Sequence, residues 1–313
     1  MGFDTSHHPV DLKTVARVTD YIAGKGSIDD LVNDAVRVAK IRFRANEWGL
    51  GVMNLKKAPS TFDTSLQVWG RPFFIAATGA EAIGEMIDRY LAAKTTAQAD
   101  KIAKENLALL DKTLPKHVKP KKEGSLPNDA NLAKGTREIM DLLRAAHTAA
   151  KTKGGTVKLP DGDESNASEL LAREVPLRVL EFCAATRPGW MDRGYVWPTQ
   201  LFYKAKVKPG KLFVPPRALL GKLGDEKRKW FLESTITENY MVGGFVSAKD
   251  VPALCKLLVT NRAKLEAAWG KPPDEEMKAS VQKLIEAAED AKLRKMAFVE
   301  ATEVYSGFCG VMN

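Results

Sequence analysis

The chain has 313 residues, of which 44% are hydrophobic and 28% are charged. This balance excludes a largely disordered chain, because such a sequence buries enough apolar surface to offset the conformational entropy lost on folding. The net charge of +9 is spread evenly, with 19 basic against 15 acidic residues over 1–125 and 29 against 24 over 126–313. The charge therefore gives little support to a dedicated polyanion-binding region.

Near the start of the chain, Asp4, His7, His8 and Asp11 form the densest polar cluster. Imidazole and carboxylate groups together bind zinc, manganese or iron, so His7, His8 and Asp11 are candidate metal ligands. If residues 4–8 are extended, the two histidines point to opposite sides and cannot share a metal without a turn. The alternative, which we favour, is that Asp11 caps the helix that follows.

Two amphipathic helices are predicted next, over residues 12–23 and from Ser27 through at least Ala39. Ser27 and Asp30 have the spacing of a capping box, in which each side chain satisfies a free backbone N–H group. From residue 46 to residue 71 glycines and prolines interrupt the helical pattern. This stretch is predicted to form loops and at most one short strand.

Further helices are predicted over residues 79–93 and 96–114, and again from Asn128 to about residue 151. Between them, residues 115–128 are rich in lysine and proline, a composition that is typical of a linker or exposed loop. The lysines of this segment are either solvated or contact nucleic acid. They are Lys116, Lys119, Lys121 and Lys122.

A short hairpin and a helix from about Ser168 are predicted to follow, and Pro176 is predicted to break or restart that helix. Residues 188–198 are predicted to form a loop that is rich in aromatic side chains. Aromatic residues on loops often anchor binding partners, although they also fill cores between elements. The candidate partner-binding residues here are Trp190, Tyr195 and Trp197.

In residues 201–208 every second residue is apolar, and three of the residues between them are lysines. This alternation predicts a strand with one lysine-rich face. Lys204, Lys206 and Lys208 are therefore candidates for binding an acidic partner or nucleic acid. The alternative is that these lysines protect an exposed strand edge, since clustered positive charges repel an incoming strand. The two interpretations differ in whether that edge is covered.

The C-terminal part is predicted to contain two strands and two helices. In order these are a strand at 240–246, a helix from Ser247 to Trp269 opened by Asp250, a long helix after the prolines at 272–273, and a strand at 297–305.

The three cysteines, Cys183, Cys255 and Cys309, are widely spaced and include no CxxC pair, which favours reduced thiols. Cys309 lies in a glycine-rich segment and is a candidate catalytic nucleophile, with His8 as the candidate base. That pairing requires the two ends of the chain to meet. No secretory signal or membrane-spanning run is evident, so we expect a soluble, cytoplasmic protein.

No phosphate-binding loop, dinucleotide fingerprint, HExxH or GxSxG motif is present in the sequence. No cofactor is evident, and the absence of these motifs favours a protein that is not an enzyme. The leading hypothesis is an intracellular protein-binding protein, an adaptor or inhibitor of another protein. The alternatives are a metal- or cysteine-dependent enzyme with its site near the chain termini, and a nucleic-acid-binding protein that uses its lysine-rich surfaces.

The predicted fold class is α+β, predominantly helical, with a small and mainly antiparallel sheet contributed chiefly by the C-terminal third. The predicted organisation is a helical region over residues 1–114, a linker over 115–128 and an α+β region over 129–313. The alternative is that the first and last regions pack as a single domain.

Overall fold

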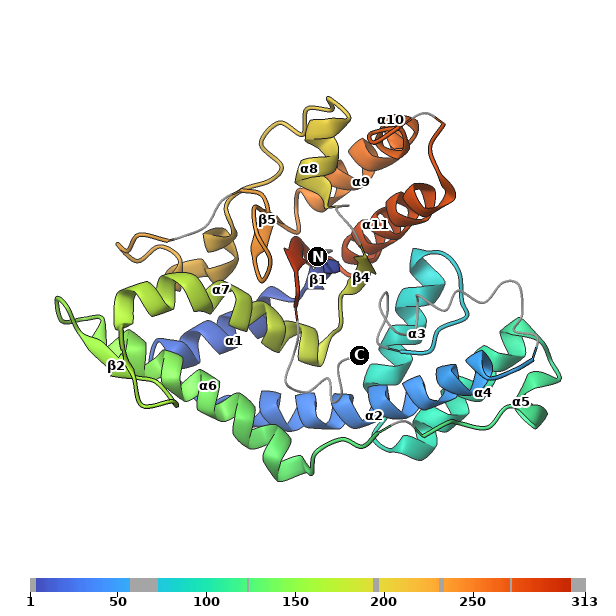
Figure 1. Ribbon diagram of the computed structural model, residues 1–313, viewed down its shortest axis with the longest axis horizontal. Coiled ribbons are helices and arrows are strands. Elements are labelled where there is room, and N and C mark those ends of the chain that lie inside the picture. The colour runs from blue at the N-terminus through green and yellow to red at the C-terminus, as the bar shows by residue number, and fades with distance from the viewer. Residues whose placement is uncertain are drawn as a thin grey trace.

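The computed structural model describes residues 4–56, 73–122, 124–193, 197–230, 234–270 and 272–304. Helices make up most of this part of the chain, and a four-stranded antiparallel sheet lies among them (Figure 1). The predicted α+β class, predominantly helical with a small antiparallel sheet, is confirmed. None of the described helices combines the length and the apolar character needed to cross a bilayer.

Most of the helices lie where the apolar periodicity of the sequence predicts them. They are α1 (Leu12–Ile22), α2 (Asp29–Met53), α3 (Ala80–Ala92), α4 (Thr96–Leu110), α5 (Leu114–His117), α6 (Asp129–Ala149), α7 (Ala167–Thr186), α8 (Pro198–Lys204), the 3-10 helix η2 (Pro216–Leu223), α9 (Val251–Thr260), α10 (Arg262–Glu266) and α11 (Glu275–Leu293). The strands are β1 (Asp4–Val10), β2 (Thr156–Lys158), β3 (Glu164–Asn166), β4 (Trp190–Arg193), β5 (Val242–Val246) and β6 (Ala297–Thr302).

The main sheet joins the two ends of the described chain. Its strand order is β4-β1-β6-β5, and all its neighbouring strands are antiparallel. The first strand, β1, therefore lies between β4 and the last strand, β6, with His7 opposite Glu300 on one side and opposite Trp190 on the other. Strands β2 and β3 form a separate hairpin, as predicted.

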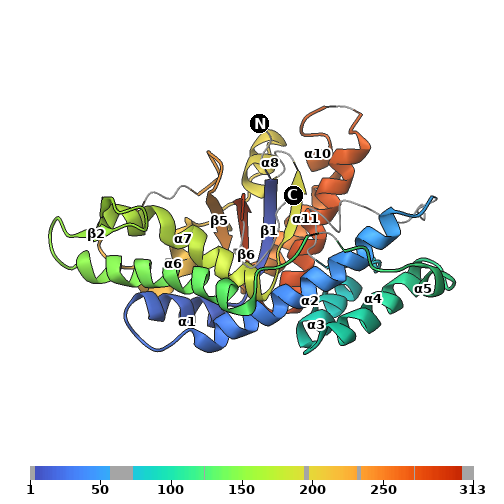
Figure 2. The same ribbon diagram turned by 60° about the horizontal axis from the view of Figure 1, so that its bottom comes forward.

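Both faces of the sheet are covered by helices, so β1 and β6 are buried along almost their whole length (Figure 2). One face carries Val10, Val299 and Phe245 and packs in a hydrophobic cluster with residues of α1, α6, α7 and η2. The other face carries Phe298 and Trp190 and packs in a second cluster with residues of α3, α9 and α11. Residues before 115 and residues after 128 share both clusters, and the predicted boundary at 115–128 stays a prediction.

Helix α2 is longer than predicted, because the glycines after residue 46 do not end it. It continues to Met53, and Gly51 lies where a Cβ atom would be 2.2 Å from the backbone oxygen of Lys119. This glycine therefore allows the segment after α5 to pack directly on the helix. Val118 is buried there, and the N–H of Lys121 donates to the carbonyl of Glu47 at 2.8 Å.

The strand predicted at residues 201–208 is wrong, because residues 198–204 form α8. Pro198 occupies the first turn of this helix, where the missing N–H removes no intrahelical hydrogen bond. Leu201 and Phe202 are adjacent in sequence and both fully buried, whereas Tyr203 is 80% exposed. The alternation in the sequence therefore does not correspond to a strand.

Three further local predictions are corrected. Residues 190–193, predicted as loop, form the edge strand β4, and Pro176 lies inside α7 without ending it. At the start of α2, the Ser27 hydroxyl donates to the carboxylate of Asp29 at 2.7 Å and accepts from its N–H at 3.1 Å. Asp30 is therefore not the capping partner of Ser27.

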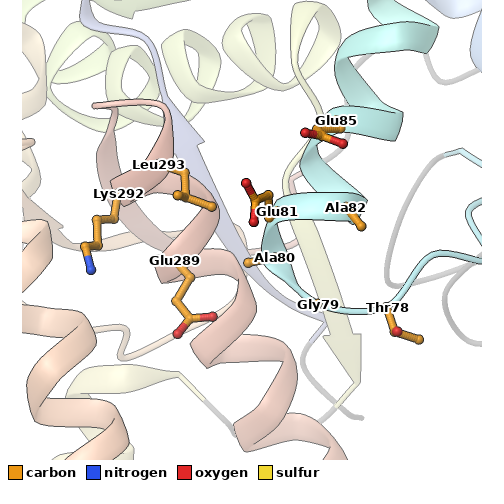
Figure 3. Close-up of a pocket in the computed structure, with 9 residues that line it drawn as sticks. All are labelled: Thr78, Gly79, Ala80, Glu81, Ala82, Glu85, Glu289, Lys292 and Leu293. Atoms are coloured by element: carbon orange, nitrogen blue, oxygen red, sulfur yellow. The ribbon is translucent and has the colours of Figure 1, made fainter.

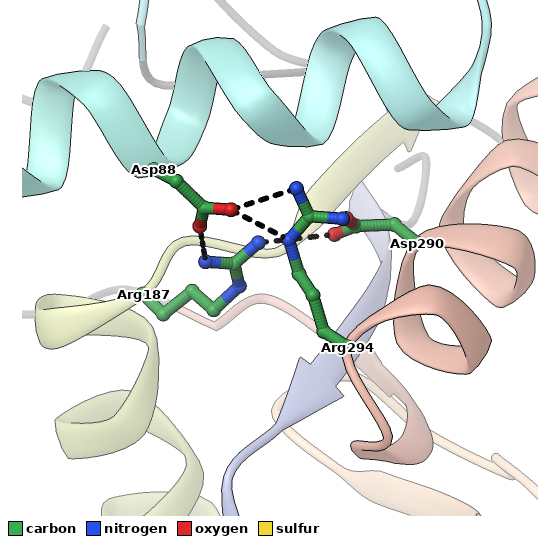
Figure 4. A network of polar contacts seen from close by, with 4 residues as sticks. All are labelled: Asp88, Arg187, Asp290 and Arg294. Carbon is green, nitrogen blue, oxygen red and sulfur yellow. Dashed lines mark hydrogen bonds and ion pairs between the residues drawn. The ribbon is translucent and has the colours of Figure 1, made fainter.

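Four charged side chains join α3, the end of α7 and α11 (Figure 4). Asp88 on α3 contacts Arg187 at 2.6 Å and Arg294 at 2.7 Å, and Asp290 on α11 contacts the same two arginines at 3.4 Å and 2.7 Å. Asp290 is buried, and burial raises its pKa in spite of the two arginines, which lower it. Gly84 on α3 faces this network, since a Cβ atom there would lie 2.3 Å from Asp290 Oδ1 and 2.5 Å from Arg294 Cζ.

We expect Gly84→Ala to destabilise the fold by about 1–3 kcal/mol, because the added methyl group displaces buried, paired side chains. Gly135→Ala on α6 is the matched control, since a Cβ atom at Gly135 meets nothing within 4 Å. That variant should gain about 0.5–1 kcal/mol from helix propensity. Urea unfolding monitored by circular dichroism measures both. Equal effects at the two sites would show that the network tolerates the methyl group.

Candidate functional site

The face of the sheet beneath α11 carries a buried group of polar side chains. Residues that face each other on antiparallel strands point to the same side, so Trp190, His7 and Glu300 form one row across β4, β1 and β6. Asp192, Thr5 and Thr302 form the next row. Buried polar groups require internal partners, because they have lost their hydrogen bonds to water.

Glu300 has such partners on α8 and β5. Its carboxylate accepts hydrogen bonds from the Thr199 N–H at 3.0 Å, the Thr199 hydroxyl at 2.5 Å and the Gly244 N–H at 2.9 Å. Burial nevertheless raises the pKa of Glu300 to about 7, because these three hydrogen bonds only partly offset the loss of water. The carboxyl group therefore links the sheet to the first turn of α8.

His7 lies on the same face and is fully buried. Its ring stacks on that of Phe298 with centroids 6.2 Å apart, and within the described part of the chain neither ring nitrogen has a hydrogen-bond partner. Burial, with a smaller contribution from Lys283, lowers the pKa of His7 to about 3, so the ring is neutral at physiological pH. Lys283 on α11 forms a buried ion pair with Asp192 at 3.1 Å.

The three candidate metal ligands do not converge. Strand β1 is extended, so His8 points to the face opposite His7, where its Nε2 atom lies 2.8 Å from the Ser6 hydroxyl. Asp11 caps α1 by accepting from the N–H of Lys13 at 3.0 Å. Among the described residues there is no group of three or more histidines, cysteines and acids that could hold a metal ion.

The candidate nucleophile Cys309 lies outside the described residues, so its distance to His8 stays untested. The pairing of β1 with β6 does bring the two ends of the described chain together, as that hypothesis requires. Burial lowers the pKa of His8 to about 3, with a smaller effect of His7. Cys183 and Cys255 are buried, and burial raises their pKa values to about 12 and about 11, so neither thiol is activated.

The aromatic candidates lie inside the protein where they are described. Trp190 is fully buried on β4, and Trp197, which immediately precedes α8, is also buried. Tyr195 lies outside the described residues. The side chains of Trp190 and Trp197 therefore contribute to the core and do not form an exposed contact surface.

The lysine candidates, in contrast, lie on the surface beside an exposed aromatic ring. Lys204, Lys206 and Lys208 are all exposed, and so is Tyr203 between Phe202 and Lys204. We call these four residues the α8 surface. Sequence reasoning missed Tyr203 because it placed this residue on the apolar side of a strand, whereas a helical reading from Pro198 puts it on the outer side of α8.

A cavity of about 570 Å³ lies between the first turn of α3 and the last turns of α11 (Figure 3). Glu81 points toward α11 in this view, and Glu85, Glu289 and Lys292 also line the space. Three carboxylates against one ammonium group make the cavity acidic. None of the candidate site residues predicted from the sequence lines it.

The chain matches no protein-family model, no curated protein sequence and no solved structure.

We expect Glu300→Gln to gain stability relative to the wild type as the pH rises from 4.5 to 7. In this window the folded carboxyl group still holds a proton that the unfolded chain has lost, so the contribution of Glu300 to folding weakens as pH rises. The difference in free energy of unfolding between the two proteins should change by about 3 kcal/mol across the window. The contributions of His7 and His8 cancel in that difference, because both proteins contain them.

Chemical denaturation at a series of pH values measures this difference. Glu138→Gln, on the exposed side of α6, is the control and should change little with pH. A Glu300→Gln difference that is flat between pH 4.5 and 7 would show that the carboxyl group titrates normally.

Proposed function

We propose that this chain is a protein-binding protein that holds an acidic segment of its partner on the α8 surface. The observation that carries the proposal is the side chain of Tyr203, which is 80% exposed and is followed within five residues of the chain by three exposed lysines. Tyrosine is enriched among residues that dominate binding energy, because it offers a large, rigid contact area with a polar end. The lysines attract a partner of opposite charge and orient its approach.

The alternative role of the lysines, protection of a strand edge, loses its basis at these positions. Residues 198–204 are helical and residues 205–208 form no strand, so none of the three lysines lies on a strand edge that it would protect. An exposed apolar side chain also follows a helix that packs against α8. This helix is α10, and Trp269, three residues after its end, is 43% exposed.

Contacts with the protein core fix the position of the α8 surface. This favours binding, because a fixed surface loses less conformational freedom when a partner binds. Leu201 and Phe202 are buried and anchor α8 in the core. The centroids of the Phe202 and Phe213 rings are 5.8 Å apart. Glu300 accepts two hydrogen bonds from Thr199 in the first turn. Beyond the helix, the N–H of Val207 donates to the carbonyl of Phe202 at 2.9 Å, which folds the lysine segment back onto the helix.

We expect Tyr203→Ala to weaken partner binding at least tenfold, since truncation of a central aromatic anchor costs about 2 kcal/mol or more. The triple variant Lys204→Glu, Lys206→Glu, Lys208→Glu should weaken it further and reduce its salt dependence. Native mass spectrometry of the protein purified from its own cells identifies the stoichiometric partner. The Kd of that partner is then measured for each variant at low and moderate salt.

The charge-matched control is Lys116→Glu, Lys119→Glu, Lys122→Glu, which reverses three exposed lysines of the segment after α4. This control should leave the Kd unchanged. Equal Kd values for the wild type and the α8 variants would contradict the proposal. Loss of the complex on nuclease treatment would instead identify the partner as nucleic acid.

A further inference from the structure

A second cavity, of about 270 Å³, opens where the end of α6, the start of α7 and the segment after η2 meet. We propose that it binds the phosphate group of a small phosphorylated molecule or free phosphate. The residues that line it are His147, Ala150, Lys151, Ser168, Glu226, Lys227 and Arg228. The site lies outside the α8 surface and does not depend on the function proposed for that surface.

Arg228 supplies the main evidence for a bound anion. Its side chain is only 10% exposed, yet its Nε and Nη1 atoms have no hydrogen-bond partner among the described residues. Its remaining terminal nitrogen, Nη2, pairs with Glu226, and the guanidinium group lies 5.3 Å from the centre of the Trp230 ring. Buried donors without a partner are costly, and guanidinium N–H groups form strong, charge-assisted hydrogen bonds to phosphate oxygens.

The charges around the cavity also favour an anion. Lys151, Lys227 and Arg228 bring three positive charges against the single carboxylate of Glu226. That carboxylate is already engaged, because His147 Nε2 lies 2.8 Å from one oxygen and Arg228 pairs with the other. Burial raises the pKa of Glu226, but the hydrogen bonds from His147 and Arg228 outweigh this effect and hold the pKa below its ordinary value.

The two helix ends at the cavity act in opposite directions. Ser168 lies in the first turn of α7, a 20-residue helix whose N-terminal end carries a partial positive charge, and its hydroxyl is a further donor. Ala150 caps the C-terminal end of α6, where backbone carbonyls carry a partial negative charge. Lys151 follows directly and places a full positive charge at that end, which more than offsets the carbonyls. The balance favours a group with several negative oxygens.

Isothermal titration calorimetry of the full chain with inorganic phosphate, and separately with glycerol phosphate, tests the proposal at neutral pH. We expect one saturable site per chain. Lys151→Gln and Lys227→Gln should each raise the Kd about tenfold, and Arg228→Lys should raise it more because lysine lacks the additional N–H donors of the guanidinium group. Tighter binding of glycerol phosphate identifies a phosphorylated small molecule as the ligand, and tighter binding of inorganic phosphate identifies the free ion.

Lys153→Gln is the matched control, because Lys153 is an exposed lysine two residues from Lys151 that does not line the cavity. Its Kd should equal that of the wild type. No saturable binding of either probe would overturn the proposal, and so would an unchanged Kd in the Lys151→Gln, Lys227→Gln double variant. Both of these lysines are exposed, so the test does not depend on whether the Arg228 variant folds.

Discussion

The pairing of β1 with β6 is the interaction on which the rest of this structure depends. It joins the first and last described elements of the chain in the middle of the sheet, and helices then cover the sheet on both faces. Because both strands are enclosed, even their polar side chains are buried. Each of these groups lacks water, so the sheet must satisfy it internally or leave it neutral.

Glu300 and His7 show the two outcomes. Glu300 accepts three hydrogen bonds and thereby connects β6 to β5 and α8, whereas His7 is kept neutral by burial beside Phe298. A carboxyl group that spans three elements makes the position of α8 depend on the sheet. The exposed face of α8 is therefore held by contacts formed at the centre of the protein.

Charged side chains have a different role at the junctions between helices. The network of Asp88, Arg187, Asp290 and Arg294 is internally balanced, with two acids and two arginines, and it joins three helices (Figure 4). The cavity beside Arg228 is not balanced, since three cations face one engaged carboxylate. This contrast separates a structural network from a proposed binding site. The end of α6 that lines the cavity lies beside β2, well apart from α8 in both ribbon views (Figures 1 and 2).

The sequence by itself determined the α+β class, most of the helices and the strands β5 and β6, because apolar periodicity and caps such as Asn128 are local properties. It also identified the lysines of the α8 surface, although in the wrong element. Only the tertiary structure decided that α2 continues past Gly51, that residues 190–193 pair with β1 and that Tyr203 is exposed. His7 and Glu300, which lie in one row of the sheet, are 293 positions apart in the chain. Lys151 and Arg228, which line one cavity, are 77 positions apart. No local pattern records which distant segments meet, because register and packing are set by the whole fold.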